Sequence, residues 1–158
     1  MDGALTLGML VAFGRMARLR VVSAPVSFYI YIMRSTPLIL VIFWFYFLVP
    51  LLAQWITNSP TPVPVGPDKS AYITFTIFEA AYYCEIIRAG IQSIPRGQIS
   101  AAYALGLSYR QAMQYVVLPQ AFRNMVPLLL TQSIVLFQDI SLVYVISLSD
   151  FLGAAAKI

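Results

Sequence analysis

Long stretches without a charged side chain are the feature that most constrains this chain. No residue between Arg34 and Asp68 is charged, and Asp139 alone interrupts the run from Asn124 to Ser149. A helix needs about 20 mostly apolar residues to cross a hydrocarbon layer of about 30 Å. Several such runs in so short a chain disfavour the alternative of a soluble protein with large core helices. We therefore expect an all-α, polytopic integral membrane protein.

The distribution of basic residues predicts its orientation. Four arginines occur with no acidic residue between Glu85 and Asp139: Arg88, Arg96, Arg110 and Arg123. Basic loops remain in the cytoplasm under the positive-inside rule, so this region and the cluster of Arg15, Arg18 and Arg20 are expected there. The proline-rich segment 50–70 is expected outside. The net charge of +4 does not indicate a nucleic-acid partner, because the basic residues are sparse.

These patterns predict one transmembrane domain over residues 1–158. The predicted segments are a partial first span (3–14), a span (25–50), an external loop (51–69), a span (70–94), a cytoplasmic loop (95–120) and a span (121–148). The ten apolar residues from Ala4 to Phe13 reach only about 15 Å as a helix. The first span is therefore expected to be incomplete and, with a short tail after the last span, the chain to be truncated at both ends.

Local signals predict where helices begin and break within the spans. Ser23 with Pro25, and Asp68 or Ser70, are placed to begin the second and third spans. Pro37 lies inside an apolar run, and we expect it to kink the helix there because proline cannot donate to the ladder.

Two short helices are predicted in the cytoplasmic loop. Gly106 is placed to end the first in a left-handed conformation, and Ser108 with Gln111 forms a capping-box pattern at the start of the second. Leu118 and Pro119 are expected to close the second helix before the last span begins.

Ionisable residues within spans are costly and are functional candidates by default. The candidates for a substrate path are Arg34, Glu79, Glu85, Arg88 and Asp139. Structural alternatives remain open for several of them. Glu85 and Arg88 are spaced to form an ion pair on one helix, Arg34 can extend to the interface, and Asp139 can cap a helix break or bind a neighbouring element.

Two functional classes can be tested against the residues of such a membrane protein. An intramembrane enzyme would need a histidine, a Ser/Lys dyad or an aspartate pair in its spans, and this chain has no histidine. No metal site is expected either, since the only cysteine is Cys84. A self-sufficient secondary carrier is the second rival, and it would transport without an ATPase.

The segment from Gly97 to Ala121 resembles the cytoplasmic "EAA" loop of ABC importer permeases. Ala101 and Ala102 match the alanines of that motif, Gly106 its glycine, and Leu118-Pro119 its closing pair. Ser100 stands where the family has glutamate, which removes a charge from the loop. Flanking segments also look like polar amino-acid permeases: Arg34-Ser-Thr-Pro37, Glu85-Ile-Ile-Arg-Ala-Gly90, Ser93-Ile-Pro-Arg-Gly-Gln98 and Gln138-Asp-Ile-Ser-Leu142.

The resemblance implies a type I ABC importer transmembrane domain in the bacterial inner membrane. It implies as partners two ATPase subunits, a second permease subunit (the same chain or a relative), a periplasmic or lipid-anchored binding protein, and membrane lipid. The chain has no phosphate-binding Gly-rich loop, so ATP is expected on the ATPase subunits, with Ala101, Ala102, Gly106, Leu118 and Pro119 coupling the permease to them. No cofactor and no enzymatic activity are expected on this chain.

Two further segments are similar to the glutamate/aspartate branch of these permeases. They are Phe78-Glu-Ala-Ala-Tyr-Tyr83 and the run Met125-Val-Pro-Leu-Leu-Leu-Thr-Gln132 with its continuation to Asp139. Glutamate and aspartate are accordingly the expected substrates.

Overall fold

The computed structural model describes residues 2–17, 19–61 and 65–146, and within these ranges the chain is helical apart from short connections. No strand occurs there, which confirms the all-α class. In chain order the elements are α1 (Asp2–Met16), α2 (Arg20–Ser35), α3 (Leu38–Phe43), the π-helical η1 (Trp44–Leu48), α4 (Val49–Thr57), α5 (Pro67–Gln92), α6 (Arg96–Ala104), α7 (Tyr109–Gln111), the π-helical η2 (Ala112–Val117), α8 (Leu118–Asp139) and the 3₁₀-helical η3 (Ile140–Ile146).

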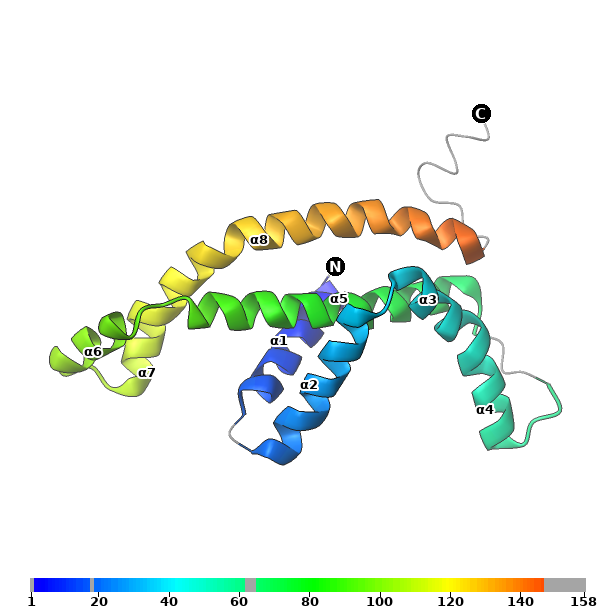
Figure 1. The fold of residues 1–158 in the computed structure, drawn as a ribbon, viewed down its shortest axis with the longest axis horizontal. Coiled ribbons are helices and arrows are strands. Elements are labelled where there is room, and N and C mark those ends of the chain that lie inside the picture. Colours follow the sequence, from blue (N-terminus) through cyan, green and yellow to red (C-terminus); the bar gives the residue numbers. More distant parts are fainter. Residues whose placement is uncertain (1, 18, 62–64, 147–158) are drawn as a thin grey trace.

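Helix α5 is the axis of the molecule, and the other long elements are arranged around it (Figure 1). Helix α8 returns alongside α5 in the opposite direction, and α6 and α7 lie beyond the end where the two helices join. The α1–α2 hairpin projects from the middle of α5, while α3 and α4 leave from its other end. Two sides of α5 are thus covered, one by the α1–α2 hairpin and one by α8.

Small residues allow α1 to approach α5 closely. Ala4 and Ala12 are buried, and a Cβ at Gly8 between them would come within 2.7 Å of Cβ of Tyr83. Real Cβ atoms do not approach so closely, so this contact requires glycine. Contacts between small residues bring the two backbones together, which maximises dispersion contact between the helices.

A second close contact joins α5 to α8 near their shared end. A Cβ at Gly90 would lie 2.2 Å from Cγ of Met125 and 3.3 Å from the carbonyl oxygen of Ala121. The amide of Asn124 donates to the hydroxyl of Ser93 at 2.8 Å. These contacts fix the crossing point from which α5 and α8 extend.

Both π-helical turns precede a proline, at Pro50 and Pro119. In each turn an amide donates to the carbonyl five residues earlier. Val49 donates to the carbonyl of Trp44, and Leu118 donates to the carbonyl of Met113. Proline clashes with the carbonyl four residues earlier in an α-helix, and a wider turn moves that carbonyl away. Because of this turn, the expectation that Leu118 and Pro119 close a helix is wrong: η2 continues directly into α8.

Two predicted helix starts are also wrong. Helix α2 begins at Arg20, and its extra turn packs on α1, where a Cβ at Gly14 would contact Val26 and Val22 at 3.2 and 3.8 Å. Ser23 and Pro25 therefore lie inside the helix. Helix α5 begins at Pro67 after Gly66, without a side-chain cap from Asp68 or Ser70, because proline suits the first helical position.

At Pro37 the predicted kink is a complete break. Helix α2 ends at Ser35, and α3 begins at Leu38. Thr36 and Pro37 both adopt extended backbone conformations between them. The expected disruption is present and is larger than a bend.

Among the described residues, two continuous helical stretches are long and apolar enough to cross a bilayer: Leu38–Thr57, with a mean hydropathy of 2.2, and Tyr109–Val143, with 1.6. The helix after Pro37 extends to Thr57, so the external loop predicted over residues 51–69 shortens to the connection between α4 and α5, of which 62–64 lie outside the described residues. The last predicted span (121–148) is helical to Ile146, and its final two residues also lie outside the described ranges.

Candidate functional site

Three arginines from three elements surround the carboxylate of Glu85. Nε of Arg15 on α1 lies 3.2 Å from Oε1, and Nη1 of Arg34 at the end of α2 lies 3.6 Å from Oε2. Arg88 donates to Oε2 through Nε at 3.1 Å and Nη2 at 2.7 Å, which confirms the expected pair one turn along α5. One carboxylate thus links α1, α2 and α5, and the cluster keeps an excess of two positive charges.

Arg34 is the member that Glu85 holds least closely. Its ion pair is the longest of the three, and its side chain is 46% exposed, against 27% for Arg15 and 30% for Arg88. The Arg34 guanidinium also lies 5.6 Å from the ring centroid of Tyr82, within the range of a cation–π contact. Arg34 can therefore leave Glu85 while two charge partners remain on that carboxylate.

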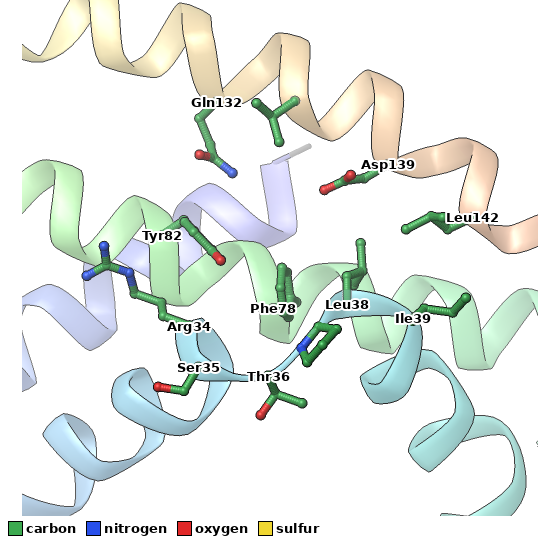
Figure 2. Close-up of a pocket in the computed structure, with 12 residues that line it drawn as sticks. Arg34, Ser35, Thr36, Leu38, Ile39, Phe78, Tyr82, Gln132, Asp139 and Leu142 are labelled. Atoms are coloured by element: carbon green, nitrogen blue, oxygen red, sulfur yellow. The ribbon is translucent and has the colours of Figure 1, made fainter.

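A cavity of about 510 Å³ lies between the break at Pro37, α5 and α8, and we name it the outer cavity. It is lined by Arg34, Ser35, Thr36, Pro37, Leu38, Ile39, Phe78, Tyr82, Gln132, Val135, Asp139 and Leu142. Figure 2 shows Gln132 and Asp139 projecting from α8 towards the α5 side of this space. The cavity contains one guanidinium and one carboxylate on otherwise mostly apolar walls.

Two further cavities share residues with the outer one. The inner cavity, of about 320 Å³, is lined by Arg34, Tyr82, Glu85, Ile86, Ala89, Leu128, Thr131 and Gln132. The side cavity, of about 390 Å³ between the hairpin and α5, is lined by Arg15, Ser27, Ile30, Tyr31, Arg34, Ser35, Tyr82 and Glu85. Arg34 and Tyr82 line all three cavities.

Of the five candidates for the substrate path, the structure brings Arg34, Glu85 and Arg88 together and places Asp139 in the outer cavity with Arg34. Glu79 lies apart from the arginine cluster. It is fully buried, and its Oε2 accepts a hydrogen bond of 2.9 Å from the amide of Gln132. Glu79 thus joins α5 to α8 and holds the side chain of Gln132, which lines both the outer and the inner cavity.

The cytoplasmic-loop motif forms two helices joined by a defined turn. Gly106 has φ = +79°, as its position in the motif predicts. Its amide donates to the carbonyl of Tyr103 at 2.9 Å, and the amide of Leu107 donates to that of Ala102 at 3.1 Å. These two hydrogen bonds form the Schellman motif, which satisfies backbone carbonyls at the end of α6.

The start of the second helix carries the predicted capping box. The amide of Gln111 donates to the hydroxyl of Ser108 at 3.4 Å, and the amide of Ser108 donates to the Gln111 side chain at 2.9 Å. In α6, Ala101 and Ala104 are exposed, whereas Ala102 is only 2% exposed, and Leu105 at the end of the helix is 82% exposed. Ala102 therefore packs inside the loop, and Leu105 faces outward.

Sequence reasoning missed three residues that shape the site: Arg15, Tyr82 and Gln132. The basic cluster of the sequence indicates only that Arg15 lies on the cytoplasmic side. Its position at the end of an apolar helix also allows it to pair with an acidic residue in a neighbouring helix. Tyr82 and Gln132 lie in segments that resemble glutamate/aspartate permeases, but they carry no charge, so the charge pattern does not distinguish them from other polar or aromatic residues. Their role follows from the crossing of α5 and α8.

Comparisons with known proteins identify the family of the chain. Residues 4–158 match the family described as the inner membrane component of binding-protein-dependent transport systems. The chain is 55% identical, over 139 residues, to the glutamate/aspartate import permease protein GltK of Escherichia coli O6:H1, covering 85% of this chain and 62% of that protein. It is 37% identical to the probable glutamine ABC transporter permease protein GlnP of Bacillus subtilis, covering 94% of this chain and 64% of that protein.

A solved structure shares the fold. A crystal structure of an amino acid ABC transporter with histidines superposes with a TM-score of 0.84 at 29% identity, over 99% of this chain and 68% of the other. The chain therefore spans about two thirds of the length of these relatives. The helices around the outer and inner cavities belong to the matched part.

Proposed function

The chain belongs to the inner membrane component family of binding-protein-dependent transport systems, and we propose that it serves as the permease subunit of an ATP-driven importer of glutamate and aspartate. The 55% identity to a glutamate/aspartate import permease is the observation that carries this proposal. A self-sufficient secondary carrier has no comparable support, because the family is defined by dependence on a binding protein.

The protein acts in the bacterial inner membrane as a multi-pass subunit. The apolar helices Leu38–Thr57 and Tyr109–Val143 support two crossings. Helix α5 supports a third, since its 26 residues reach about 39 Å. Of its charged residues, Glu85 and Arg88 belong to the arginine cluster and Glu79 is bonded to Gln132, while Asp68 and Lys69 lie at its exposed start. The shorter apolar helix α1 packs beside α5.

Energy comes from partners. Two ATPase subunits bind and hydrolyse ATP and dock on the loop formed by α6, α7 and η2, where Leu105 and Tyr109 are exposed. Ala101, Gly106 and Ser108 shape that surface, and no enzymatic step occurs on this chain. A second permease subunit covers the open side of the cavities, and a binding protein delivers substrate from outside.

The outer cavity is the substrate position. An acidic amino acid has two carboxylates and one ammonium, so its transfer into a low dielectric is costly without partners. Arg34 supplies a planar guanidinium for a carboxylate, and Asp139 supplies a carboxylate for the ammonium. The excess positive charge of the Arg15, Arg34 and Arg88 cluster offsets the net negative charge of the substrate.

The test is uptake by the full-length transporter in proteoliposomes with its ATPase, partner permease and binding protein. We expect glutamate to accumulate only when ATP and the binding protein are both present, and aspartate to compete. Accumulation driven by a proton gradient without ATP would contradict the proposal, and uptake of neutral amino acids alone would contradict the assigned substrate.

A further inference from the structure

The outer and inner cavities lie end to end along the groove between α5 and α8. Along α5 the outer cavity contacts Phe78, and the inner cavity contacts Ile86 and Ala89. Along α8 the order is reversed, with Val135 and Asp139 at the outer cavity and Leu128 and Thr131 at the inner one. Because the two helices run in opposite directions, both series describe the same path from one cavity to the next.

Arg34, Tyr82 and Gln132 lie where the cavities meet, because they line both. They come from three different elements and face one another across the groove (Figure 2). The ring of Tyr82 lies beside the guanidinium of Arg34, and Gln132 is held by its hydrogen bond to Glu79. One side chain from each of the three elements therefore lies at the level where the two cavities adjoin.

We propose that Arg34, Tyr82 and Gln132 form the constriction of the substrate path and that Arg34 passes the substrate carboxylate across it. This inference rests on the proposed function and adds specific roles to it. Tyr82 blocks the passage when Arg34 lies against its ring. Gln132, fixed by Glu79, forms the opposite wall.

The contacts of Glu85 explain how Arg34 can move. In the structure Arg34 faces Glu85 at 3.6 Å, whereas Arg15 at 3.2 Å and Arg88 at 2.7 Å hold the same carboxylate. A substrate carboxylate in the outer cavity can replace Glu85 as the partner of Arg34 without leaving Glu85 unpaired. When Arg34 returns to Glu85 at the inner cavity, the substrate carboxylate is carried past Tyr82.

The test places single cysteines on either side of the constriction in the full-length transporter, in a Cys84→Ser background. Thr131→Cys lies in the inner cavity and Val135→Cys in the outer one, about 6 Å apart along α8. An anionic, membrane-impermeant thiol reagent is added to the cytoplasmic face without nucleotide. We expect Val135→Cys to react about tenfold more slowly than Thr131→Cys, a barrier difference of about 1.4 kcal/mol.

Adding Tyr82→Ala should remove that difference by accelerating the reaction at Val135→Cys. The matched control is Tyr72→Ala, a tyrosine on the same helix that lines neither cavity, and it should leave the ratio unchanged. Equal reaction rates at both cysteines with Tyr82 present would overturn the constriction, and so would a Tyr82→Ala variant that preserves the difference.

The carrying role of Arg34 is tested separately by glutamate uptake at saturating binding protein. Arg34→Lys should retain partial uptake and Arg34→Gln should lose it, at equal abundance of the assembled complex in the membrane. Equal uptake by these two variants would contradict the role. Labelling asymmetry without any uptake of acidic amino acids would instead reject the proposed function and leave the constriction standing.

Discussion

The two sides of α5 differ in how they are packed. Towards α1 the helices are in close contact, with Gly8 against Tyr83 and Ala12 buried beside Cys84, although the side cavity lined by Arg15 and Glu85 also lies on the hairpin side. Towards α8 the helices touch at Gly90 and then border cavities that contain Arg34, Gln132 and Asp139. A close helix–helix contact on one side of α5 thus contrasts with the groove on the other side, along which we propose that substrate passes.

This contrast predicts that substitutions at the α1–α5 contact will mainly change stability, whereas substitutions of groove-lining residues such as Arg34 will mainly change transport. The variants below run from the largest expected loss of unfolding free energy to the smallest. All are made in the full-length subunit within its complex.

Glu85→Gln is expected to have the largest effect on stability. It removes the only carboxylate shared by Arg15, Arg34 and Arg88 and leaves their charges unpaired. Breaking a buried pair costs about 3–5 kcal/mol, and we expect the lower end of this range because Glu85 is not completely buried. Thermal unfolding of the purified complex measures the loss. A variant as stable as the parent would show that the cluster does not hold α1, α2 and α5 together.

Gly8→Val should destabilise the α1–α5 contact next most strongly. The added side chain must displace Tyr83 or the backbone near Ala80, and overpacking of this kind costs about 1–3 kcal/mol. Gly97→Val is the matched control, because a Cβ there meets no atom within 4 Å. The yield and melting temperature of the complex should fall only for Gly8→Val, and equal losses for both would contradict the close packing.

How far the sequence predicts this molecule depends on the range of each interaction. The Gly106 turn and the Ser108–Gln111 box were predicted correctly, since all their partners lie within a few residues. The start of α2 was predicted wrongly. Val22 and Val26 pack against Gly14 of α1, and the helix begins at Arg20, before the apparent cap at Ser23.

For the candidate site, too, local patterns are predictable from the sequence and packing between helices is not. Charge within an apolar run was enough to select Arg34 and Asp139, which the structure places around one cavity. It could not select Tyr82 or Gln132, whose importance comes from the place where α5 and α8 border two cavities. Long-range packing decides such positions, and no local pattern encodes it.

Gly106→Val should cost less stability but should disconnect the ATPase from the groove. A left-handed conformation costs a residue with a side chain about 1–2 kcal/mol, and the strain stays within the exposed turn between α6 and α7. ATP hydrolysis and glutamate uptake, measured together in proteoliposomes, should become uncoupled. Parental values of both would show that the turn does not transmit motion.

Arg34→Gln should have the smallest effect on stability and the most direct effect on transport. Glu85 keeps Arg15 and Arg88, and an ion pair as exposed as that of Arg34 contributes at most about 1 kcal/mol. The decisive measurement is initial uptake of glutamate beside glutamine at equal abundance of the complex in the membrane. The account predicts that glutamate uptake falls strongly while the melting temperature and binding-protein-stimulated ATP hydrolysis stay near their parental values. Normal glutamate uptake by Arg34→Gln would contradict a substrate path through the groove between α5 and α8.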